Sequence, residues 1–201
     1  MITILANGNY PTHPSPQQIL SSTERVICCD GAANRFVAEG GTPFAIVGDA
    51  DSLSAEVRKN FAHCLHSESE QDSNDLTKAM RFAKSLGETD ITILGATGLR
   101  ECHTLGNISL LLAYRQQGFN PTMLTDHCTI LALSGTQMLQ TQPGQQISIF
   151  SFGAKNLKSH GLKWPIYDFT ALWEGTLNEA LGHTITIEAD GDYIVMLDYI
   201  N

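Results

Sequence analysis

Short apolar runs alternate with helical patterns along the first two thirds of the chain. Each run consists mostly of aliphatic residues, and most runs end at Gly, Asp or Asn, which is typical of strands buried on both faces of a parallel sheet. The runs predict strands over residues 2–6, 25–29, 44–47, 64–67, 91–94 and 122–124.

Two segments between these runs carry apolar residues at helical spacing. Residues 75–86 have such residues at i, i+3, i+4 and i+7, with Asn74 as N-cap and Gly87 beyond the last turn. Strand and helix in alternation predict an α/β domain of three layers, in which helices cover a largely parallel sheet. The second helix is expected over residues 104–117, with Leu105, Ile108, Leu111 and Leu112 on one apolar face.

After residue 135 the pattern changes to short alternating runs separated by turn signals such as Pro143-Gly144. This change predicts a smaller all-β domain, either a sandwich or a barrel. We therefore divide the chain into an α/β domain at residues 1–134 and an all-β domain at residues 135–201. The β runs are expected at residues 145–152, 184–189 and 193–198.

Composition limits the class of partner. The 201 residues are 42% hydrophobic and 16% charged, and a net charge of −9 with only 12 Lys and Arg argues against nucleic acid or an anionic membrane as partner. The five cysteines form no C-x-x-C pair, which disfavours a disulfide framework and a zinc knuckle. No apolar stretch approaches the roughly 18 residues of a membrane span. We expect a cytoplasmic protein that is bound neither to membrane nor to nucleic acid.

Carboxylates follow several of the predicted strands. Asp30 follows one strand, Asp49 and Asp51 follow the next, and the segment 71–75 follows a third. The carboxyl ends of parallel strands share one edge, so these groups are expected to converge there. Two such charges about 4 Å apart repel by about 1 kcal/mol in water and more in a dry cleft, which a divalent cation reverses. Oxygen-only ligands favour Mg²⁺.

A simpler interpretation stands beside the metal site. Aspartate after glycine at a strand end is a common turn residue and helix cap. Asp75 lies in the first turn of a predicted helix, where the helix dipole favours a carboxylate without any function.

A glycine-containing loop at residues 95–100 joins a predicted strand to a predicted helix. Backbone N–H groups of such a loop can approach phosphate, and Arg100 could add a charge-assisted contact. The loop is neither G-x-G-x-x-G nor a Walker A sequence, so a plain turn is the alternative. Trp164, one of two tryptophans, is either a core residue or a stacking partner for a flat or cationic ligand.

Six segments in order resemble the thiamine diphosphokinase family, also called thiamine pyrophosphokinase, over most of the chain. They read CCDGAANRF, VGDADSL, QDSNDLTKAM, ILGATGLRECHTLGN, HGLKW and GTLNEALG. The resemblance implies that the hydroxyethyl group of thiamine attacks the β-phosphorus of ATP, with Mg²⁺ present, to give thiamine diphosphate and AMP. It also implies a homodimer with active sites at the subunit interface.

The resemblance further implies residue roles. Asp49, Asp51 and Asp75 would hold Mg²⁺ and the pyrophosphoryl group, and Arg100 would act beside them. The tryptophan at position 164 would stack on thiamine bound mainly by the other subunit, and Gln71 would read the aminopyrimidine. The full substrate-binding set would be Asp30, Asn34, Gln71, Asp72, His103, Trp164 and Asn178.

The chain departs from the family pattern in the glycine-rich loop. Cys102 stands where an aspartate is expected, and Leu99 replaces a glycine. A thiol cannot supply the hard anionic oxygen of an aspartate. Either Glu101 takes over this role, or the chain is slower than its relatives.

Two rival functions belong to other classes. The sequence DADSL is close to the D-x-D-x-T/V motif of haloacid-dehalogenase-like phosphatases, in which Asp49 would be phosphorylated. Leu53 at the Thr/Val position, and the place of the motif after the third strand, argue against that phosphatase. The other rival is a non-catalytic protein that binds a nucleotide or thiamine, for which Cys102 is the argument.

Overall fold

The computed structural model describes residues 2–200, which form two compact units. Among the described residues, the first comprises 2–110 and Gly118–Asp126, and the second comprises Leu111–Gln117 and 127–200. This division falls earlier in the chain than the boundary expected at residue 134. The cause is strand β7 (Cys128–Ser134), which pairs antiparallel with β13 (Asp192–Asp198) and so belongs to the second unit.

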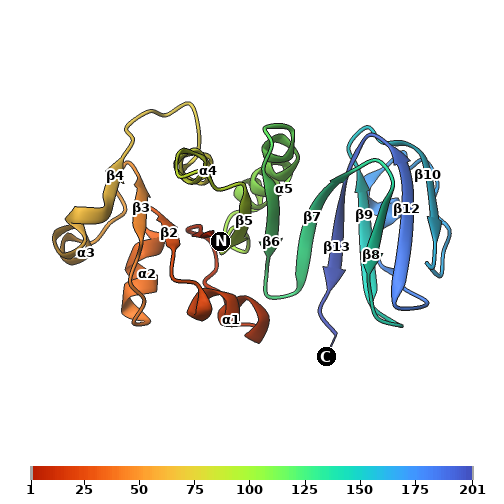
Figure 1. Ribbon diagram of the computed structural model, residues 1–201, viewed down its shortest axis with the longest axis horizontal. Coiled ribbons are helices and arrows are strands. Elements are labelled where there is room, and N and C mark those ends of the chain that lie inside the picture. Colours follow the sequence, from red (N-terminus) through yellow and green to blue (C-terminus); the bar gives the residue numbers. More distant parts are fainter. Residues whose placement is uncertain (1, 201) are drawn as a thin grey trace. The chain divides into compact units, whose positions relative to one another are not determined.

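The first unit contains a parallel sheet in the order β6-β5-β1-β2-β3-β4 (Figure 1). All six strands predicted from the apolar runs are confirmed, and their ends differ by only one or two residues. The strands are β1 (Ile2–Leu5), β2 (Val26–Cys29), β3 (Ala45–Gly48), β4 (Leu65–Ser67), β5 (Asp90–Leu94) and β6 (Asn120–Leu124).

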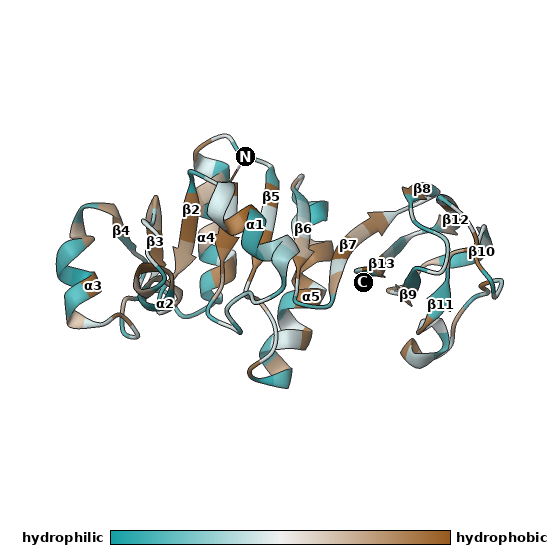
Figure 2. Cartoon of the chain, turned by 90° about the horizontal axis from the view of Figure 1, so that it is seen from below, coloured by the Kyte–Doolittle hydropathy of each residue, from teal (hydrophilic) through white to brown (hydrophobic). Residues whose placement is uncertain are grey.

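Helices cover both faces of this sheet, as the predicted three-layer arrangement requires. On one face, Cys28 of β2 packs in one core cluster with Leu20 and Phe36 from two helices. The next residue, Cys29, points to the other face, where its thiol contacts the backbone carbonyl of Asp75 at 3.6 Å. Figures 1 and 2 show the helices on the two sides of the apolar strands. The helical segments are α1 (Pro14–Ser22), α2 (Ala32–Ala38), α3 (Ala55–Asn60), η1 (Ala62–Cys64), α4 (Asp75–Ser85) and α5 (Glu101–Gln116).

Helix α4 forms as its sequence predicts. The Asn74 side chain accepts a hydrogen bond from the backbone N–H of Thr77 at 3.0 Å, which caps the first turn. Gly87, with φ of +81°, follows the last turn. The apolar stripe is buried as expected and consists of Leu76, Ala79, Met80 and Ala83.

Helix α5 begins at Glu101, earlier than the expected residue 104, and the prediction that Leu105 lies on its buried face is wrong. Leu105 is 63% exposed. Its neighbour Thr104 accepts a hydrogen bond from the backbone N–H of Gly98. One residue turns a helix by about 100°, so Leu105 faces away from the side that packs against the glycine loop.

The second unit is a sandwich of two antiparallel sheets, which confirms the predicted all-β domain. The sheets have the orders β11-β9-β13-β7 and β10-β12-β8. Their core contains Ile149 and Val195 from the first sheet and Leu157 and Ile187 from the second, as expected for packed inner faces. The remaining elements are β8 (Gln137–Gln140), β9 (Gln146–Ser151), β10 (Lys155–His160), η2 (Leu172–Gly175), β11 (Asn178–Glu179) and β12 (Thr184–Asp190).

Among the described residues, no helix combines the length and the apolar character that crossing a membrane requires.

We predict that Gly175→Ala strongly destabilises the protein. A Cβ at Gly175 would lie 1.8 Å from the carbonyl oxygen of Ile149, a backbone atom of β9. Relieving that clash requires β9 to move within the sandwich, so we expect a loss of about 2 kcal/mol or more in the free energy of unfolding. Gly182→Ala is the matched control, because a Cβ there meets nothing within 4 Å, and it should change stability by less than about 0.5 kcal/mol. Denaturant titration measures both, and equal stability of the two variants would contradict the prediction.

Candidate functional site

Aspartates from three segments meet at the end of strand β3. Asp30 directly follows β2, and Asp49 follows Gly48, the last residue of β3. A Cβ at Gly48 would lie 2.8 Å from the Cβ of Asp30 and 3.3 Å from Oδ1 of Asp75. Glycine at position 48 therefore leaves the space in which these carboxylates approach one another.

Asp30, Asp49 and Asp51 form a close group, which we name the aspartate cluster. One carboxylate oxygen each of Asp30, Asp49 and Asp51 lies within 4.8 Å of the other two. The convergence expected from the strand-end positions is therefore present in the structure. The resemblance implied Asp49, Asp51 and Asp75 as the residues that hold the metal. That role stays a prediction for Asp75, which forms an ion pair described below.

Asp30 is the buried member of the cluster. Its residue is only 3% exposed, and its Oδ2 accepts a hydrogen bond from the backbone N–H of Ser52 at 3.1 Å. Its Oδ1 is buried and has no hydrogen-bond partner among the described residues. Burial raises the pKa of the Asp30 carboxyl, and the nearby charges of Asp75 and Asp49 raise it further, against the hydrogen bonds from Ser52. A buried carboxylate oxygen without a partner is unfavourable unless a cation binds it.

Asn34 of α2 holds the loop that carries the cluster. Its amide Nδ2 donates to the carbonyl oxygen of Ser52 at 2.8 Å, and its Oδ1 accepts from the backbone N–H of Ser54 at 2.9 Å. The guanidinium of Arg58 donates to the carbonyl oxygen of Ala50 in the same loop. Asn34 was expected in the substrate cleft, but its amide is engaged with this loop.

Asp49 is the half-buried member of the cluster, between buried Asp30 and exposed Asp51. Its Oδ1 accepts from the backbone N–H of Asp51 at 3.2 Å, and its Oδ2 accepts from Nε2 of Gln71 at 3.3 Å. These hydrogen bonds, the one from Asp51 first, lower the pKa of the Asp49 carboxyl. Gln71, expected to read thiamine, is thus directly connected to the cluster.

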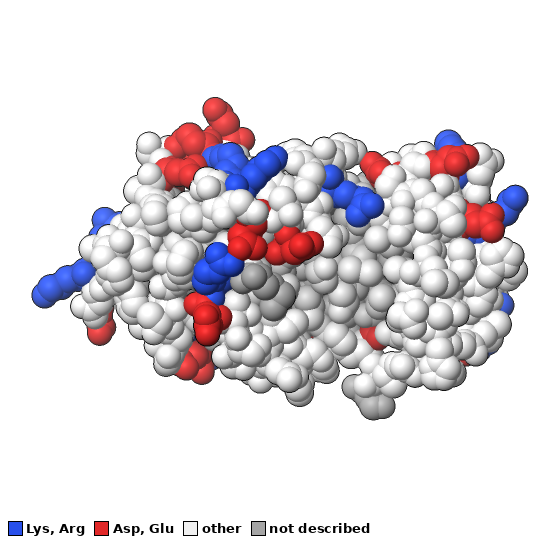
Figure 3. Space-filling model, in the orientation of Figure 1, with Lys and Arg blue, Asp and Glu red and all other residues white. Residues whose placement is uncertain are grey.

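Glu70 organises the segment between β4 and α4, and sequence reasoning missed it. Its carboxylate accepts hydrogen bonds from the backbone N–H of Asp72 at 2.8 Å and of Ser73 at 3.1 Å, and it pairs with Arg81 of α4 at 2.7 Å. The Ser73 hydroxyl and Arg81 lower the pKa of Glu70 to about 2. Figure 3 shows acidic and basic side chains beside one another over this segment. Glu70 therefore fixes the backbone that directly follows Gln71.

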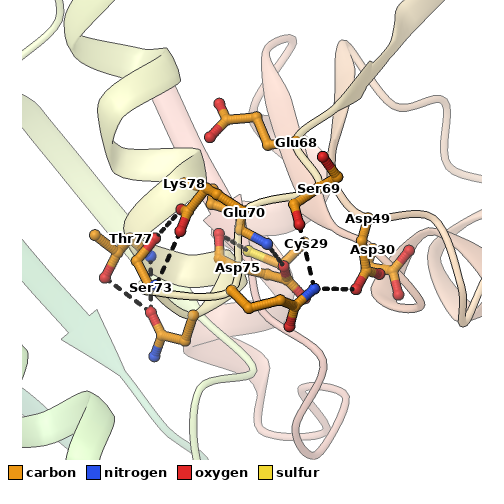
Figure 4. A network of polar contacts seen from close by, with 12 residues as sticks. Cys29, Asp30, Asp49, Glu68, Ser69, Glu70, Ser73, Asp75, Thr77 and Lys78 are labelled. Atoms are coloured by element: carbon orange, nitrogen blue, oxygen red, sulfur yellow. Dashed lines mark hydrogen bonds and ion pairs between the residues drawn. The ribbon is translucent and has the colours of Figure 1, made fainter.

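Helix α4 brings two opposite charges to the site. Asp75 is in its first turn, and Oδ1 of Asp75 lies 3.2 Å from Nζ of Lys78 (Figure 4). Lys78 is 2% exposed, which is rare for lysine. The i, i+3 spacing of this pair is visible in the sequence, but nothing in the sequence showed that the lysine is buried.

Glycines bring two loops together opposite the aspartates. The backbone N–H of Gly8 donates to the carbonyl oxygen of Gly95 at 2.7 Å, and a Cβ at Gly8 would lie 2.4 Å from that oxygen. Gly98 has a φ of +94°, and a Cβ there would overlap the side chain of Asn9. Asn107 of α5 donates to the carbonyl oxygen of Ala96 at 2.8 Å. The loop at residues 95–100 is therefore held on both sides.

A pocket of about 390 Å³ lies between these segments of the first unit. Lys78 and Gly8, which sequence reasoning missed, contribute to its wall, as does Thr97 of the glycine loop. Five of the residues that the sequence predicted line it, namely Asp49, Gln71, Asp75, Arg100 and His103.

Some predicted residues do not line this pocket. Asp72 is exposed and does not contribute to the wall, and neither do Glu101 and Cys102, which are both exposed on α5. The structure therefore gives no support to Glu101 as a replacement for the expected aspartate. An effect of Cys102 on turnover stays a prediction.

Trp164 and Asn178 form a separate arrangement in the second unit. Trp164 is 53% exposed, whereas Asn178 is 8% exposed. Oδ1 of Asn178 accepts from the backbone N–H of Trp164 at 3.2 Å, and Nδ2 donates to its carbonyl oxygen at 2.7 Å. Nζ of Lys163 lies 4.8 Å from the centre of the Trp164 ring and pairs with Glu179 at 3.0 Å. Asn178 thus holds the backbone of an exposed indole, where a direct substrate contact was expected.

Chemically, the first unit offers what binding a metal polyphosphate requires. The aspartate cluster supplies hard oxygen ligands for a divalent cation, and Arg100 and the backbone of the glycine loop supply donors for anionic oxygens. The two sets meet at one pocket, because Asp49 of the cluster lines it together with Arg100 and Thr97 of the glycine loop.

Known proteins share this fold. The structure of thiamine pyrophosphokinase from Bacillus subtilis matches with a TM-score of 0.83 at 21% identity, covering 100% of this chain and 99% of that one. The yeast thiamin pyrophosphokinase matches with a TM-score of 0.81 at 20% identity, covering 99% and 86% of the two chains.

Sequence comparison identifies the family, whereas the structural matches show only the fold. Thiamine pyrophosphokinase 1 of Oryza sativa subsp. japonica is 27% identical over 203 aligned residues, covering 84% of this chain and 76% of the rice protein. The family model described as "Thiamin pyrophosphokinase, catalytic domain" matches residues 16–123, and that described as "Thiamin pyrophosphokinase, substrate-binding domain" matches residues 129–196. With more than half of its length matched by these two models, the chain belongs to the thiamin pyrophosphokinase family.

Proposed function

We propose that the pocket of the first unit is where this chain carries out the reaction of its family, the transfer of the pyrophosphoryl group of ATP to thiamine. The chain is a thiamine diphosphokinase by its family. The observation that supports this location is the aspartate cluster beside the pocket, in which a buried oxygen of Asp30 has no partner among the described residues.

The residues present fit a Mg²⁺ ion. Asp30, Asp49 and Asp51 offer only oxygen, the ligand that Mg²⁺ prefers, and an ion would satisfy the unpartnered oxygen of Asp30. We therefore assign the ion to these three residues, with Asp75 next to them. When bound, Mg²⁺ neutralises charge on the phosphate oxygens.

Protein groups on the pocket wall position the nucleotide. Backbone N–H groups of the loop at residues 95–100 are suited to phosphate oxygens, and Arg100 adds a permanent cation that can bind them in a bidentate way. His103 lines the same wall. Holding the polyphosphate in line for attack accounts for much of the rate in phosphoryl transfer.

Binding of thiamine requires a hydrogen-bonding side chain for its aminopyrimidine and a flat aromatic surface for its thiazolium ring. Gln71 lines the pocket and is fixed next to Asp49, so we assign it to the aminopyrimidine. The thiazolium ring is a cation, which an exposed indole such as Trp164 attracts. We infer a homodimer in which Trp164 of one subunit serves the pocket of its partner. Exposed apolar side chains on the second unit support such an interface: Tyr167, Leu172, Trp173, Leu177 and Leu181.

The cysteines agree with a reducing compartment. None of the five forms a disulfide in the part of the chain that the structure describes, and four of them are buried. Disulfides are rare in the cytosol, so the five thiols support our assignment of the chain to the cytoplasm.

Product analysis tests the proposed reaction. We expect purified protein with thiamine, ATP and Mg²⁺ to form thiamine diphosphate and AMP in equal amounts, to stop when EDTA removes the metal, and to resume when Mg²⁺ is added back. Release of inorganic phosphate without thiamine would instead support the phosphatase that uses Asp49. Binding without turnover would support the non-catalytic alternative.

We predict that Asp49→Asn lowers kcat by about 100-fold or more, because it removes an anionic oxygen from the cluster while preserving shape. Asp90→Asn is the matched control. Asp90 is the first residue of β5 and so lies at the amino ends of the parallel strands, away from the cluster at their carboxyl ends. The Asp90→Asn variant should keep kcat within about twofold. Thermal unfolding of both variants checks the fold, and full activity of folded Asp49→Asn would remove the cluster from the mechanism.

We predict that Trp164→Ala raises the KM for thiamine by about tenfold and changes the KM for ATP by less than about twofold, because a desolvated cation–π contact contributes about 1 to 2 kcal/mol. Met138→Ala serves as the control, since Met138 is also a large exposed apolar residue of the second unit and is not one of the side chains that we assign to the interface. It should leave both constants nearly unchanged.

Mixing subunits tests whether Trp164 acts on its partner. After random exchange, half of the dimers formed from Asp49→Asn and Trp164→Ala subunits are mixed, and each mixed dimer contains one intact site. With thiamine well below its KM, where the Trp164→Ala homodimer has little activity, activity should therefore recover to about a quarter of the wild-type value. No recovery after confirmed exchange would place Trp164 outside the partner's site.

A further inference from the structure

Lys78 is a buried cation that no other part of the proposed mechanism requires. Its ammonium group carries three donors, and its one contact among the described residues is Oδ1 of Asp75 at 3.2 Å. Two donors of a nearly fully buried ammonium are therefore unpartnered in the part of the chain that the structure describes. Such a group is costly to bury unless something satisfies it.

The position of Lys78 indicates what that partner is. Lys78 belongs to the pocket wall together with Asp49, Asp75 and Arg100, and Figure 4 shows its side chain next to that of Asp75. Four aspartates in this region and a net chain charge of −9 repel a polyphosphate. Any bound phosphate must therefore be met by local positive charge, and the permanent cations of the wall are Lys78 and Arg100.

We propose that Lys78 binds an oxygen of the nucleotide's terminal diphosphate, with Asp75 fixing its ammonium group in place. The inference rests on the proposed function, because it names a further substrate-binding residue of the same pocket. Asp75 then acts through Lys78 as a positioning residue, and the aspartate cluster is left to hold the metal.

The alternative is that Lys78 only supports the first turn of α4. The two roles differ in which ligands they affect. A contact with the terminal diphosphate strengthens binding of a triphosphate and leaves binding of AMP unchanged, whereas a structural role changes binding of both nucleotides alike or of neither.

The test compares wild type with Lys78→Met, which keeps most of the side-chain length. The Asp75 side chain is 36% exposed, so water can solvate it after the change, and we expect the variant to fold. Isothermal titration measures binding of α,β-methylene-ATP, in which the bond to be cleaved is blocked, and of AMP, both with Mg²⁺. Lys78→Met should lose about 10- to 100-fold in affinity for α,β-methylene-ATP and less than about twofold for AMP. Lys78→Arg, which keeps the charge, should lose less.

The outcomes separate this inference from the proposed function. Unchanged affinity for α,β-methylene-ATP, or an equal loss for both nucleotides, overturns the role of Lys78 even if the wild-type enzyme converts thiamine and ATP. Absence of that conversion in wild type overturns the proposed function itself. If Lys78→Met does not fold, Lys78→Gln replaces it, and failure of both to fold shows a structural role and overturns the inference.

Discussion

Repulsion among carboxylates at the end of β2 and β3 is the constraint on which the site depends. Neighbouring strands lie about 4.8 Å apart, so the residues that follow β2 and β3 are forced close together. The oxygens of Asp30, Asp49 and Asp51 accordingly lie within 4.8 Å of one another. Folding must concentrate this charge, and the surrounding loops contain the groups that make it tolerable.

Each surrounding segment offsets part of that repulsion. The backbone of Ser52 donates to Asp30, the backbone of Asp51 donates to Asp49, and Gln71 donates to the second oxygen of Asp49. Those donors are in turn fixed, since Asn34 holds the loop of Ser52. Glu70 binds the backbone next to Gln71. The hydrogen bonds around the cluster therefore stabilise the negative charge of its carboxylates, but they do not neutralise it.

The sequence predicted those features that depend on local pattern. Helix α4 was predictable because its cap and its apolar stripe lie within one short segment. The convergence of Asp30 and Asp49 was predictable because strands in a parallel sheet end at a common edge.

Features that depend on packing between distant segments were not predictable. Burial of Lys78 depends on how α4 packs against the sheet, and exposure of Leu105 depends on α5 turning other residues toward the glycine loop. Asn178 was expected to bind substrate, but its amide binds the backbone of Trp164. The two residues are 14 positions apart in the sequence, so local pattern does not show this contact. Strand β7 pairs with β13 at the far end of the sequence, and the unit boundary moves with it.

Hydrogen bonding of buried polar atoms separates two kinds of residue in this chain, those that hold other residues in place and those that are suited to bind a ligand. Asn34 and Asn178 have both ends of their amides engaged by backbone groups, so they position other residues. Asp30 retains a buried oxygen without a partner, and Lys78 retains buried donors, both within the described residues. One of these groups requires a cation and the other requires an anion. Mg²⁺ bound to a nucleotide polyphosphate would present both charges at once, and on our proposal it would satisfy two groups that no part of the described fold satisfies.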